Sequence, residues 1–121
     1  MTDNRKRLGE TAEAFAANYL KAKGYRILAQ NYRCRHGEID IVALDKFTLV
    51  FIEVRAKRSL DFGLPQESVG HRKQKKLREV ARYYLATERD KGSICRFDVV
   101  AVLYDVENQK VQKLEHIENA F

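Results

Sequence analysis

Residues 37–57 read GEIDIVALDKFTLVFIEVRAK, a segment in which two apolar runs flank one short polar pair. The runs, EIDIVAL from Glu38 and TLVFIEVRAK from Thr48, are rich in β-branched and aromatic residues, which favour strands. The polar pair between them, Asp45-Lys46, is typical of a tight turn. These residues therefore predict a β-hairpin that turns at Asp45-Lys46.

The predicted hairpin brings acidic residues together. With a symmetric turn, Asp40 faces Phe51 and Glu38 faces Glu53 on the neighbouring strand. Because side chains alternate between the two faces of a sheet, the three acids then share one face. Asp40 becomes the diagonal neighbour of Glu53, roughly 7 to 8 Å away at the backbone. Both carboxylates can therefore reach one cation.

Carboxylates on such apolar strands are costly, because unpaired charges resist leaving water. A hard divalent cation offsets this cost, and Mg²⁺ or Mn²⁺ needs only one or two protein carboxylates. We therefore predict a divalent-metal site at Asp40 and Glu53. Two basic residues, Arg55 and Lys57, follow Glu53 on the same strand face. The alternative is that the acids form ordinary salt bridges with Arg55, Lys57 or Arg35.

The segments on either side of this hairpin predict the remaining elements. Apolar residues recur at helical spacing over residues 8–23, and Gly24 provides a C-terminal stop. A strand follows from Tyr25, and after the hairpin come a helix at 71–86 and strands at 95–106 and 111–117. Residues 58–70 predict one long loop that can move at the edge of the site. The order α-β-β-β-α-β-β predicts an α/β fold with a mixed central sheet flanked by helices.

Composition predicts one folded domain spanning residues 1–121. The chain is 45% hydrophobic and 33% charged, with a formal net charge of +6. Residues 1–36 carry eight Lys and Arg against three Asp and Glu, and residues 54–91 carry eleven against five. Between them, residues 37–53 carry one Lys against four acids. Basic flanks around an acidic centre favour phosphate binding beside a cation, and the alternative is an unevenly charged solvated surface.

The N-terminal sequence MTDNRKRLGE is polar where a secretory signal would be apolar, and no apolar run has the length of a membrane span. We expect a cytoplasmic protein that does not enter the membrane. Cys34 and Cys95 lie in no metal-binding pattern, so we expect free thiols, with a disulfide as the alternative.

Several segments together resemble a known nuclease core. They are AEAFAANYLKAKGYRIL, GEIDIVA, LVFIEVRAKRS, the helix with Lys73-Gln74, and RFDVVAV. They resemble the PD-(D/E)xK core of restriction endonucleases and archaeal Holliday junction resolvases, and more closely the YraN family of small bacterial proteins. The resemblance runs nearly end to end. It implies a restriction-endonuclease-like fold.

The resemblance also implies site residues. It assigns an acidic site to Glu13, Asp40 and Glu53, with the main-chain carbonyl of Val54 completing the metal ligands. It implies that water activated on Mg²⁺ or Mn²⁺ attacks a phosphodiester. The chain departs from the family motif where Ala12 precedes Glu13 in place of the usual Gly.

The second departure is Arg55, which stands where the family has a catalytic Lys. Arg keeps its proton, so it can polarise and position but cannot act as a base. Lys57, two residues further along the same face, is the alternative catalytic cation. Lys73 and Gln74 are candidates to contact substrate phosphate, with packing as the alternative. Asp98 also matches the family, although a structural salt bridge with Arg96 explains it better.

The function predicted is a metal-dependent, structure-selective DNA endonuclease. The catalytic candidates are Glu13, Asp40, Glu53, Arg55 and Lys57, and the nucleic-acid contacts expected are Arg33, Arg35, Arg58, Lys73 and Gln74. The alternatives are a nucleic-acid-binding module without catalysis and a protein-interaction subunit. Junction-cleaving relatives are commonly dimers, so a homodimer is one expected state.

Aromatic and histidine residues receive no functional assignment from the sequence. Stacking on unpaired bases is one role open to Tyr25, Tyr32, Tyr83 and Tyr84, although packing explains most of them better. The histidines at 36, 71 and 116 show neither metal-ligand spacing nor a catalytic triad.

Overall fold

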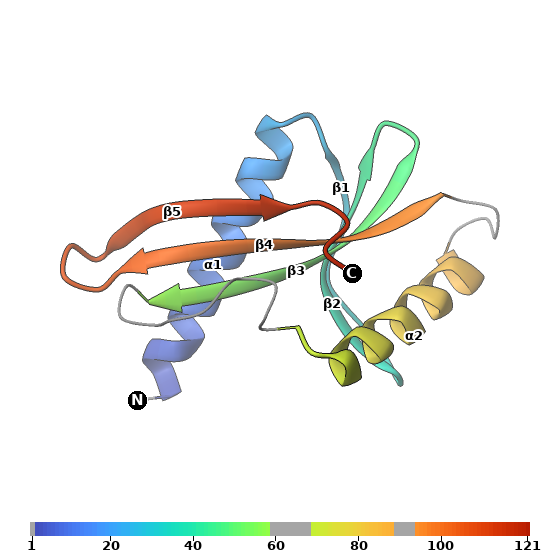
Figure 1. Cartoon of the computed structure of the whole chain (residues 1–121), viewed down its shortest axis with the longest axis horizontal. Helices are drawn as coiled ribbons and strands as arrows, with labels where there is room; N and C mark the ends of the chain where they lie inside the picture. The colour runs from blue at the N-terminus through green and yellow to red at the C-terminus, as the bar shows by residue number, and fades with distance from the viewer. Residues whose placement is uncertain (1, 59–68, 89–93) are drawn as a thin grey trace.

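The computed structural model describes residues 2–58, 69–88 and 94–121, with side chains from residue 7 onward. The chain forms seven elements in the expected order α-β-β-β-α-β-β (Figure 1). They are α1 (Thr2–Ala22), β1 (Arg26–Cys34), β2 (Gly37–Asp45), β3 (Thr48–Arg58), α2 (His71–Glu88), β4 (Cys95–Asp105) and β5 (Lys110–Ile117). Most of the loop predicted at 58–70 lies outside the described residues.

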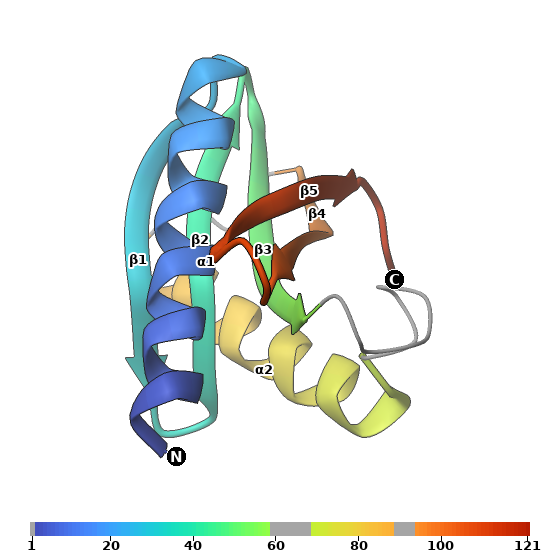
Figure 2. The ribbon, with the colours of Figure 1, turned by 90° about the vertical axis from the view of Figure 1, so that its left-hand side faces the viewer.

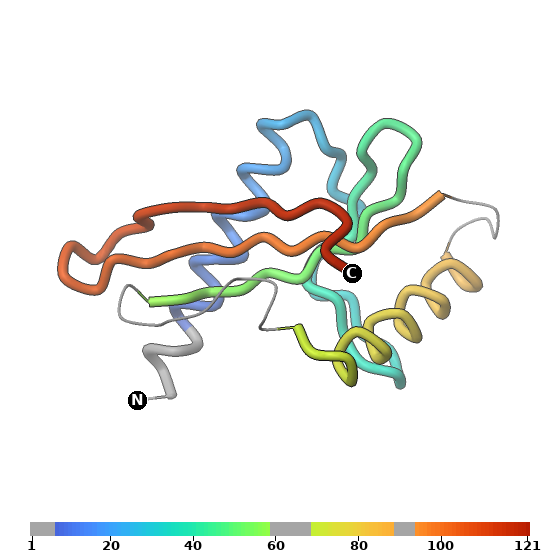
Figure 3. The backbone as a smooth tube through the Cα atoms, in the orientation of Figure 1, coloured from blue at the N-terminus to red at the C-terminus, as the bar shows by residue number. Residues whose placement is uncertain are grey.

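The five strands form one mixed sheet in the order β1-β2-β3-β4-β5. β3 and β4 are parallel, and every other neighbouring pair is antiparallel. Parallel neighbours need a crossover, and α2 lies in the connection from β3 to β4. The β4–β5 hairpin extends away from α2 (Figure 3). This architecture confirms the predicted α/β fold with a mixed sheet and is consistent with a restriction-endonuclease-like fold.

The two helices cover the two faces of the sheet (Figure 2). One core lies under α1, where Ala16 and Leu20 pack with residues of the strands. The other lies under α2, where Val80 and Tyr84 pack with a different set of strand residues. Neighbouring strand residues serve opposite cores because their side chains alternate. The alternation is clear in β3, where Val50 and Ile52 belong to the α1 core and Leu49 and Phe51 to the α2 core.

The β2–β3 hairpin turns one residue later than the sequence predicted. Asp45 pairs with Thr48, so the turn is Lys46-Phe47, and Lys46 takes a left-handed backbone with φ 57°. The carboxylate of Asp45 accepts a hydrogen bond from Arg96 Nη1 at 3.1 Å, which keeps Asp45 at the end of β2. The predicted turn at Asp45-Lys46 is therefore wrong.

The later turn also corrects the predicted pairing. Phe51 pairs with Val42 rather than with Asp40, and the ladder between β2 and β3 ends at the pair Ile41 and Ile52. The register differs from the predicted one by two residues. A two-residue shift keeps every side chain on its face, because strands have a period of two. Asp40 and Glu53 therefore share one face of the sheet in both the predicted and the observed register.

A buried polar network ties β4 to β5. Asp98 is fully buried and accepts hydrogen bonds from Arg96 Nε at 3.0 Å and from the Asn119 N–H at 3.1 Å. His116 Nε2 lies 2.7 Å from its other oxygen. Burial by itself would raise the pKa of Asp98, but the hydrogen bonds from His116 and Arg96 hold it below its ordinary value. The structural interpretation of Asp98 is confirmed, and His116 gains a structural role.

Both cysteines, Cys34 and Cys95, carry free thiols, as expected. None of the helices in the described part of the chain has the length and apolarity needed to cross a membrane.

Candidate metal centre and nucleic-acid cleft

A cleft of about 660 Å³ opens between the β2–β3 strands and the first half of α2. Three of its lining residues are acidic, Glu38, Asp40 and Glu53, and four are basic, Arg55, Arg72, Lys73 and Lys76. Glycine and apolar residues complete the wall, namely Gly37, Val54, Gly70, Leu77 and Val80. The cleft therefore combines an acidic floor with cationic walls.

The acidic floor forms where β2 and β3 stop pairing. Beyond the last pair, Ile41 and Ile52, the Val54 N–H donates to Asp40 Oδ2 at 2.8 Å. A side-chain oxygen thus takes the main-chain donor that would otherwise bond a strand carbonyl. This bond holds the Asp40 carboxyl group beside Glu53.

The two carboxyl groups are close enough to affect each other strongly. Burial and a hydrogen bond with Glu53 raise the pKa of Asp40 well above its ordinary value. Burial opposes ionisation of Glu53 too, but the contacts with Asp40 and Lys73 lower its pKa. The pair therefore ionises unequally, because a buried carboxylate and a half-buried one side by side repel each other.

Lys73 supplies a positive charge to this pair. Its Nζ lies 2.6 Å from Glu53 Oε2, and the Glu53 side chain is only 7% exposed. Lys73 reaches the acid from the first turn of α2. The sequence predicted that Lys73 contacts phosphate, with packing as the alternative. The ion pair with Glu53 is a third role, which the sequence did not predict.

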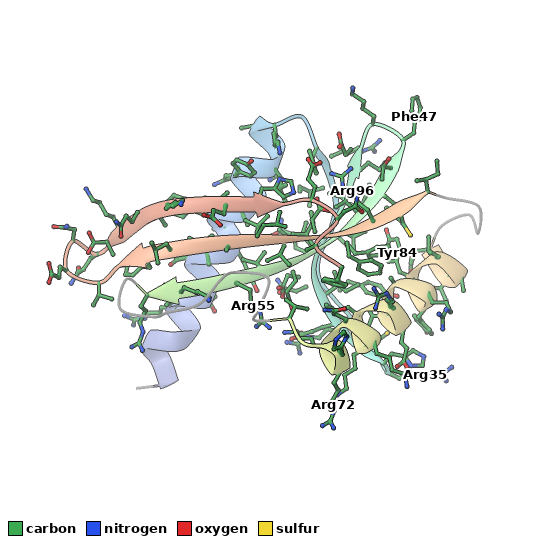
Figure 4. All side chains as sticks on the ribbon, in the orientation of Figure 1. Arg35, Phe47, Arg55, Arg72, Tyr84 and Arg96 are labelled. Atoms are coloured by element: carbon green, nitrogen blue, oxygen red, sulfur yellow. The ribbon has the colours of Figure 1, made fainter. Side chains whose placement is uncertain are left out.

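The first turn of α2 is basic, although acidic side chains are favoured at a helix N-terminus. This turn contains no acidic residue, and basic side chains follow from His71 onward. Positive charge at a helix N-terminus opposes the helix dipole, whereas an anion bound there would be stabilised. Figure 4 shows Arg72 pointing outward from this turn and Arg55 pointing from β3 toward it. The arrangement suits a phosphate group above the acidic floor.

Gln74 lies at the start of α2, where its side chain and main chain both make hydrogen bonds. Its side-chain Nε2 donates to the Val69 carbonyl at 2.8 Å, and its main-chain N–H donates to the Gly70 carbonyl at 2.9 Å. Gln74 is also absent from the cleft lining. Its visible role is to fix the start of α2.

Glu13 lies on α1, outside the cleft lining. Its pKa is raised by burial and by nearby Glu38, with a smaller effect from Glu53, so it is near enough to feel the acid pair. Within residues 2–58, 69–88 and 94–121, no three His, Cys, Asp or Glu side chains gather as a metal cluster. The structure therefore brings Asp40 and Glu53 together in the cleft, while Glu13 interacts with them electrostatically from outside the cleft lining.

The other predicted nucleic-acid contacts, Arg33, Arg35 and Arg58, do not line the cleft. Arg33 Nε is 2.9 Å from Glu38 Oε2, at the cleft's edge. Arg35 lies over the ring of Tyr83. Arg58 lines a separate hollow of about 430 Å³, which also includes Arg7. Lys57 lines neither hollow.

Arg72 and Lys76 line the cleft but were not sequence candidates. Their spacing of four residues places them on one helix face, which is the signal that could have identified them.

The donor set fits a hard divalent cation. Asp40 and Glu53 offer carboxylate oxygens within hydrogen-bonding reach of each other, and the main chain of Val54 lines the same cleft. Mg²⁺ typically uses one or two carboxylates and retains several waters, so a larger acidic cluster is not required. The residues present are therefore compatible with Mg²⁺ or Mn²⁺.

Comparison with known proteins gives consistent full-length matches. The family described as "Uncharacterised protein family UPF0102" matches residues 12–102. A UPF0102 protein of Pelotomaculum thermopropionicum and one of Moorella thermoacetica are each 52% identical over 121 residues, covering 100% of both chains. A UPF0102 protein of Desulforamulus reducens is 46% identical over 122 residues, covering 99% of both. These names state no activity.

Proposed function

The chain belongs to the uncharacterised protein family UPF0102, and we propose that it is a divalent-metal-dependent, structure-selective endonuclease that hydrolyses DNA phosphodiester bonds. The observation that carries the proposal is the adjacent carboxyl pair, Asp40 and Glu53, in a cleft lined by four cationic side chains. A phosphodiester needs both features, because its backbone is anionic and its cleavage develops further negative charge.

Asp40 and Glu53 would hold Mg²⁺ or Mn²⁺ together with the main-chain carbonyl of Val54. Bound there, the cation would lower the pKa of water and offset charge on the phosphate. The Val54 N–H fixes the Asp40 carboxyl group through its 2.8 Å hydrogen bond, so this ligand is already oriented.

The basic residues would act on the DNA. Arg72 and Lys76 lie one turn apart on α2 and would bind successive phosphates of one strand. Arg55 would position the phosphate and offset charge in the transition state, because its guanidinium remains protonated. Lys73 would leave Glu53 when a divalent cation binds there, and its ammonium would then be available to the phosphate.

A cleavage assay tests this proposal. Branched, single-stranded and duplex DNA would be incubated with Mg²⁺, Mn²⁺ or EDTA, using the wild type, Asp40→Asn and Glu53→Gln. We expect metal-dependent cleavage by the wild type and its loss in both variants. Glu107→Gln is the control, because Glu107 is exposed on the β4–β5 turn away from the cleft.

Metal binding would be measured separately by calorimetric titration of Mn²⁺. Asp40→Asn should bind far more weakly than the wild type and Glu107→Gln. Equal binding by the wild type and Asp40→Asn would rule out the proposed site.

A nucleic-acid-binding module without catalysis is the second candidate. Two features favour it: the resemblance to the PD-(D/E)xK core implies a Lys where this chain has Arg55, and Lys73 already neutralises Glu53 at 2.6 Å. In this case the wild type binds DNA but leaves it intact with every metal. Cleavage by Arg55→Lys alone would identify a nuclease fold that has lost its chemistry.

A further inference from the structure

A solvent-facing aromatic and cationic cluster lies beside the cleft. The rings of His36 and Tyr83 have centroids 5.7 Å apart at 59°, and the Arg35 guanidinium lies 5.9 Å from the Tyr83 centroid. Arg35 Nε also donates to His36 Nε2 at 3.4 Å. Arg35 and His36 are exposed, and Tyr83 is half-buried. Tyr83 belongs to neither hydrophobic core, whereas its neighbour Tyr84 is buried in one.

Gly37 joins this cluster to the cleft. It has φ +139°, and a Cβ atom there would lie 3.3 Å from Val80 Cγ2. The glycine therefore lets the β1–β2 turn approach α2 closely, which brings His36 to Tyr83. Gly37 and Glu38 line both the cleft and a second hollow of about 410 Å³ that includes Arg33. The two hollows share a wall.

A stripe along α2 leads from the cleft to the cluster. Arg72, Lys76 and Tyr83 are separated by four and seven residues, so they lie along one helix face. Ten residues from Lys73 to Tyr83 correspond to about 15 Å of helix. At about 3.4 Å per nucleotide, this length matches roughly four nucleotides of a stacked strand.

Two acids interrupt the positive charge. Glu79 lies on the same stripe of α2, and Glu38 lies at the shared wall, where Arg33 Nε is 2.9 Å from its carboxylate. Arg35, Arg72 and Lys76 remain along the route from the cleft to the cluster, so positive charge predominates there.

We propose that Arg35, His36 and Tyr83 form a stacking platform for an unpaired base of the strand held in the cleft. The substrate would then be DNA with a single-stranded segment next to the cleaved phosphate, an inference that rests on the proposed function. Exposed aromatic rings bind unpaired bases because each base offers a π-face, whereas bases inside a duplex are covered by their neighbours. Arg35 would add a cation–π contact to the same base.

Binding in EDTA tests the platform independently of cleavage. Affinity would be measured for a fluorescently labelled single-stranded oligonucleotide and for a blunt duplex of the same sequence. Tyr83→Ala should weaken single-strand binding by about five- to a hundredfold, with a much smaller effect on the duplex. Tyr83→Phe should retain single-strand binding, because it keeps the ring. A loss confined to the single strand would indicate lost stacking, because a general loss of packing would weaken single-strand and duplex binding alike.

Phe47→Ala is the matched control. Phe47 is 93% exposed at the tip of the β2–β3 hairpin, far from α2 in Figure 4. A second variant, His36→Ala, changes an exposed turn residue and should weaken single-strand binding in the same direction. 2-Aminopurine at successive positions of the oligonucleotide should show a fluorescence decrease at one position, absent in Tyr83→Ala.

Equal losses of single-strand and duplex affinity in Tyr83→Ala, or a loss no greater than in Phe47→Ala, would overturn the platform. Selective loss of single-strand binding by a protein that cleaves no DNA would support the platform and refute the nuclease. Metal-dependent cleavage with no effect of Tyr83→Ala on single strands would support the nuclease and refute the platform.

Discussion

Among single residues, Lys73 has the clearest effect on the acid pair, because its ammonium lies 2.6 Å from Glu53 Oε2. This contact stabilises the charged form of Glu53 beside Asp40. A buried carboxylate without a partner costs several kcal/mol, so loss of one partner is usually more harmful than loss of the pair. Asp40 meets the same problem differently, through a raised pKa and a hydrogen bond from the Val54 N–H. A divalent cation and Lys73 are therefore competing counter-charges for Glu53.

This competition predicts the behaviour of Lys73→Ala. In EDTA, the free energy of unfolding of the variant should be about 1–2 kcal/mol lower than that of the wild type, because Glu53 loses its counter-charge. The loss is moderate because Lys73 is partly exposed, so solvent already weakens the ion pair. Thermal unfolding with and without saturating Mn²⁺ measures the effect. Mn²⁺ should raise the melting temperature more in Lys73→Ala than in the wild type, because no ammonium competes for Glu53.

The control for this comparison is Lys75→Ala, which removes an exposed lysine from the same helix. It should respond to Mn²⁺ as the wild type does. An identical Mn²⁺ response in Lys73→Ala and the wild type would contradict competition for Glu53.

Arg55 gives a second prediction at the scale of single residues. If its role is electrostatic, Arg55→Lys retains or improves cleavage, and Arg55→Ala loses about a hundredfold or more in rate, as for other contacts that stabilise transition-state charge. Single-turnover cleavage rates measure this directly. Unchanged activity in Arg55→Ala combined with loss in Lys57→Ala would instead assign the catalytic cation to Lys57.

At the scale of elements, the cleft depends on two places where regular structure stops. The β2–β3 ladder ends after Ile41 and Ile52, which frees the Val54 N–H for Asp40. The β1–β2 turn ends at Gly37, whose backbone lets that turn approach Val80 on α2. The acids come from the strands and three of the four cations from α2, so the site requires α2 to cross beside the point where the strands separate.

Glycine substitutions test this arrangement. Gly37→Ala should lower the free energy of unfolding by about 1–2 kcal/mol, because φ +139° strains an L-residue and the new Cβ would crowd Val80. Gly9→Ala should instead raise it by up to about 1 kcal/mol, because Gly9 lies inside α1 with no atom within 4 Å of an added Cβ. Urea unfolding measures both, and stabilisation by Gly37→Ala would be inconsistent with a constrained turn.

At the scale of the whole molecule, charge is distributed around the site by topology. The sequence carries a net charge of +6, with acids concentrated in residues 37–53. Folding places the acid pair between strands and the cationic face of α2, while the β4–β5 hairpin extends elsewhere. A polyanion would therefore be attracted over a broad surface but would meet the acids only inside the cleft.

Salt dependence tests this surface. The logarithm of the DNA-binding constant should fall linearly with the logarithm of salt concentration. Removing two phosphate contacts with Arg72→Ala and Lys76→Ala together should reduce the magnitude of the slope by about 2. Lys21→Ala with Lys110→Ala removes the same charge away from the cleft and should change the slope little. A flat salt response in the wild type would argue against phosphate binding.

Local patterns in the sequence were sufficient for the elements and for part of the site. Helical spacing of apolar residues predicted the helices, and runs rich in β-branched and aromatic residues predicted strands, because both signals depend on neighbours along the chain. It was also predictable that Asp40 and Glu53 lie on the same face, because a two-residue shift in the pairing of β2 with β3 leaves every side chain on its face. The turn was not predictable, because Asp45 is held by Arg96, 51 residues away in sequence.

Contacts between residues of different elements could not be predicted from local patterns. The Lys73–Glu53 ion pair and the contact of His36 with Tyr83 both depend on where α2 crosses the sheet. No local pattern encodes that position, because it follows from how the apolar faces of α2 and the strands pack into one core. The acid pair could therefore be identified from the sequence, whereas the packing of α2 on the sheet determines the counter-charge of Glu53 and the aromatic surface beside the cleft.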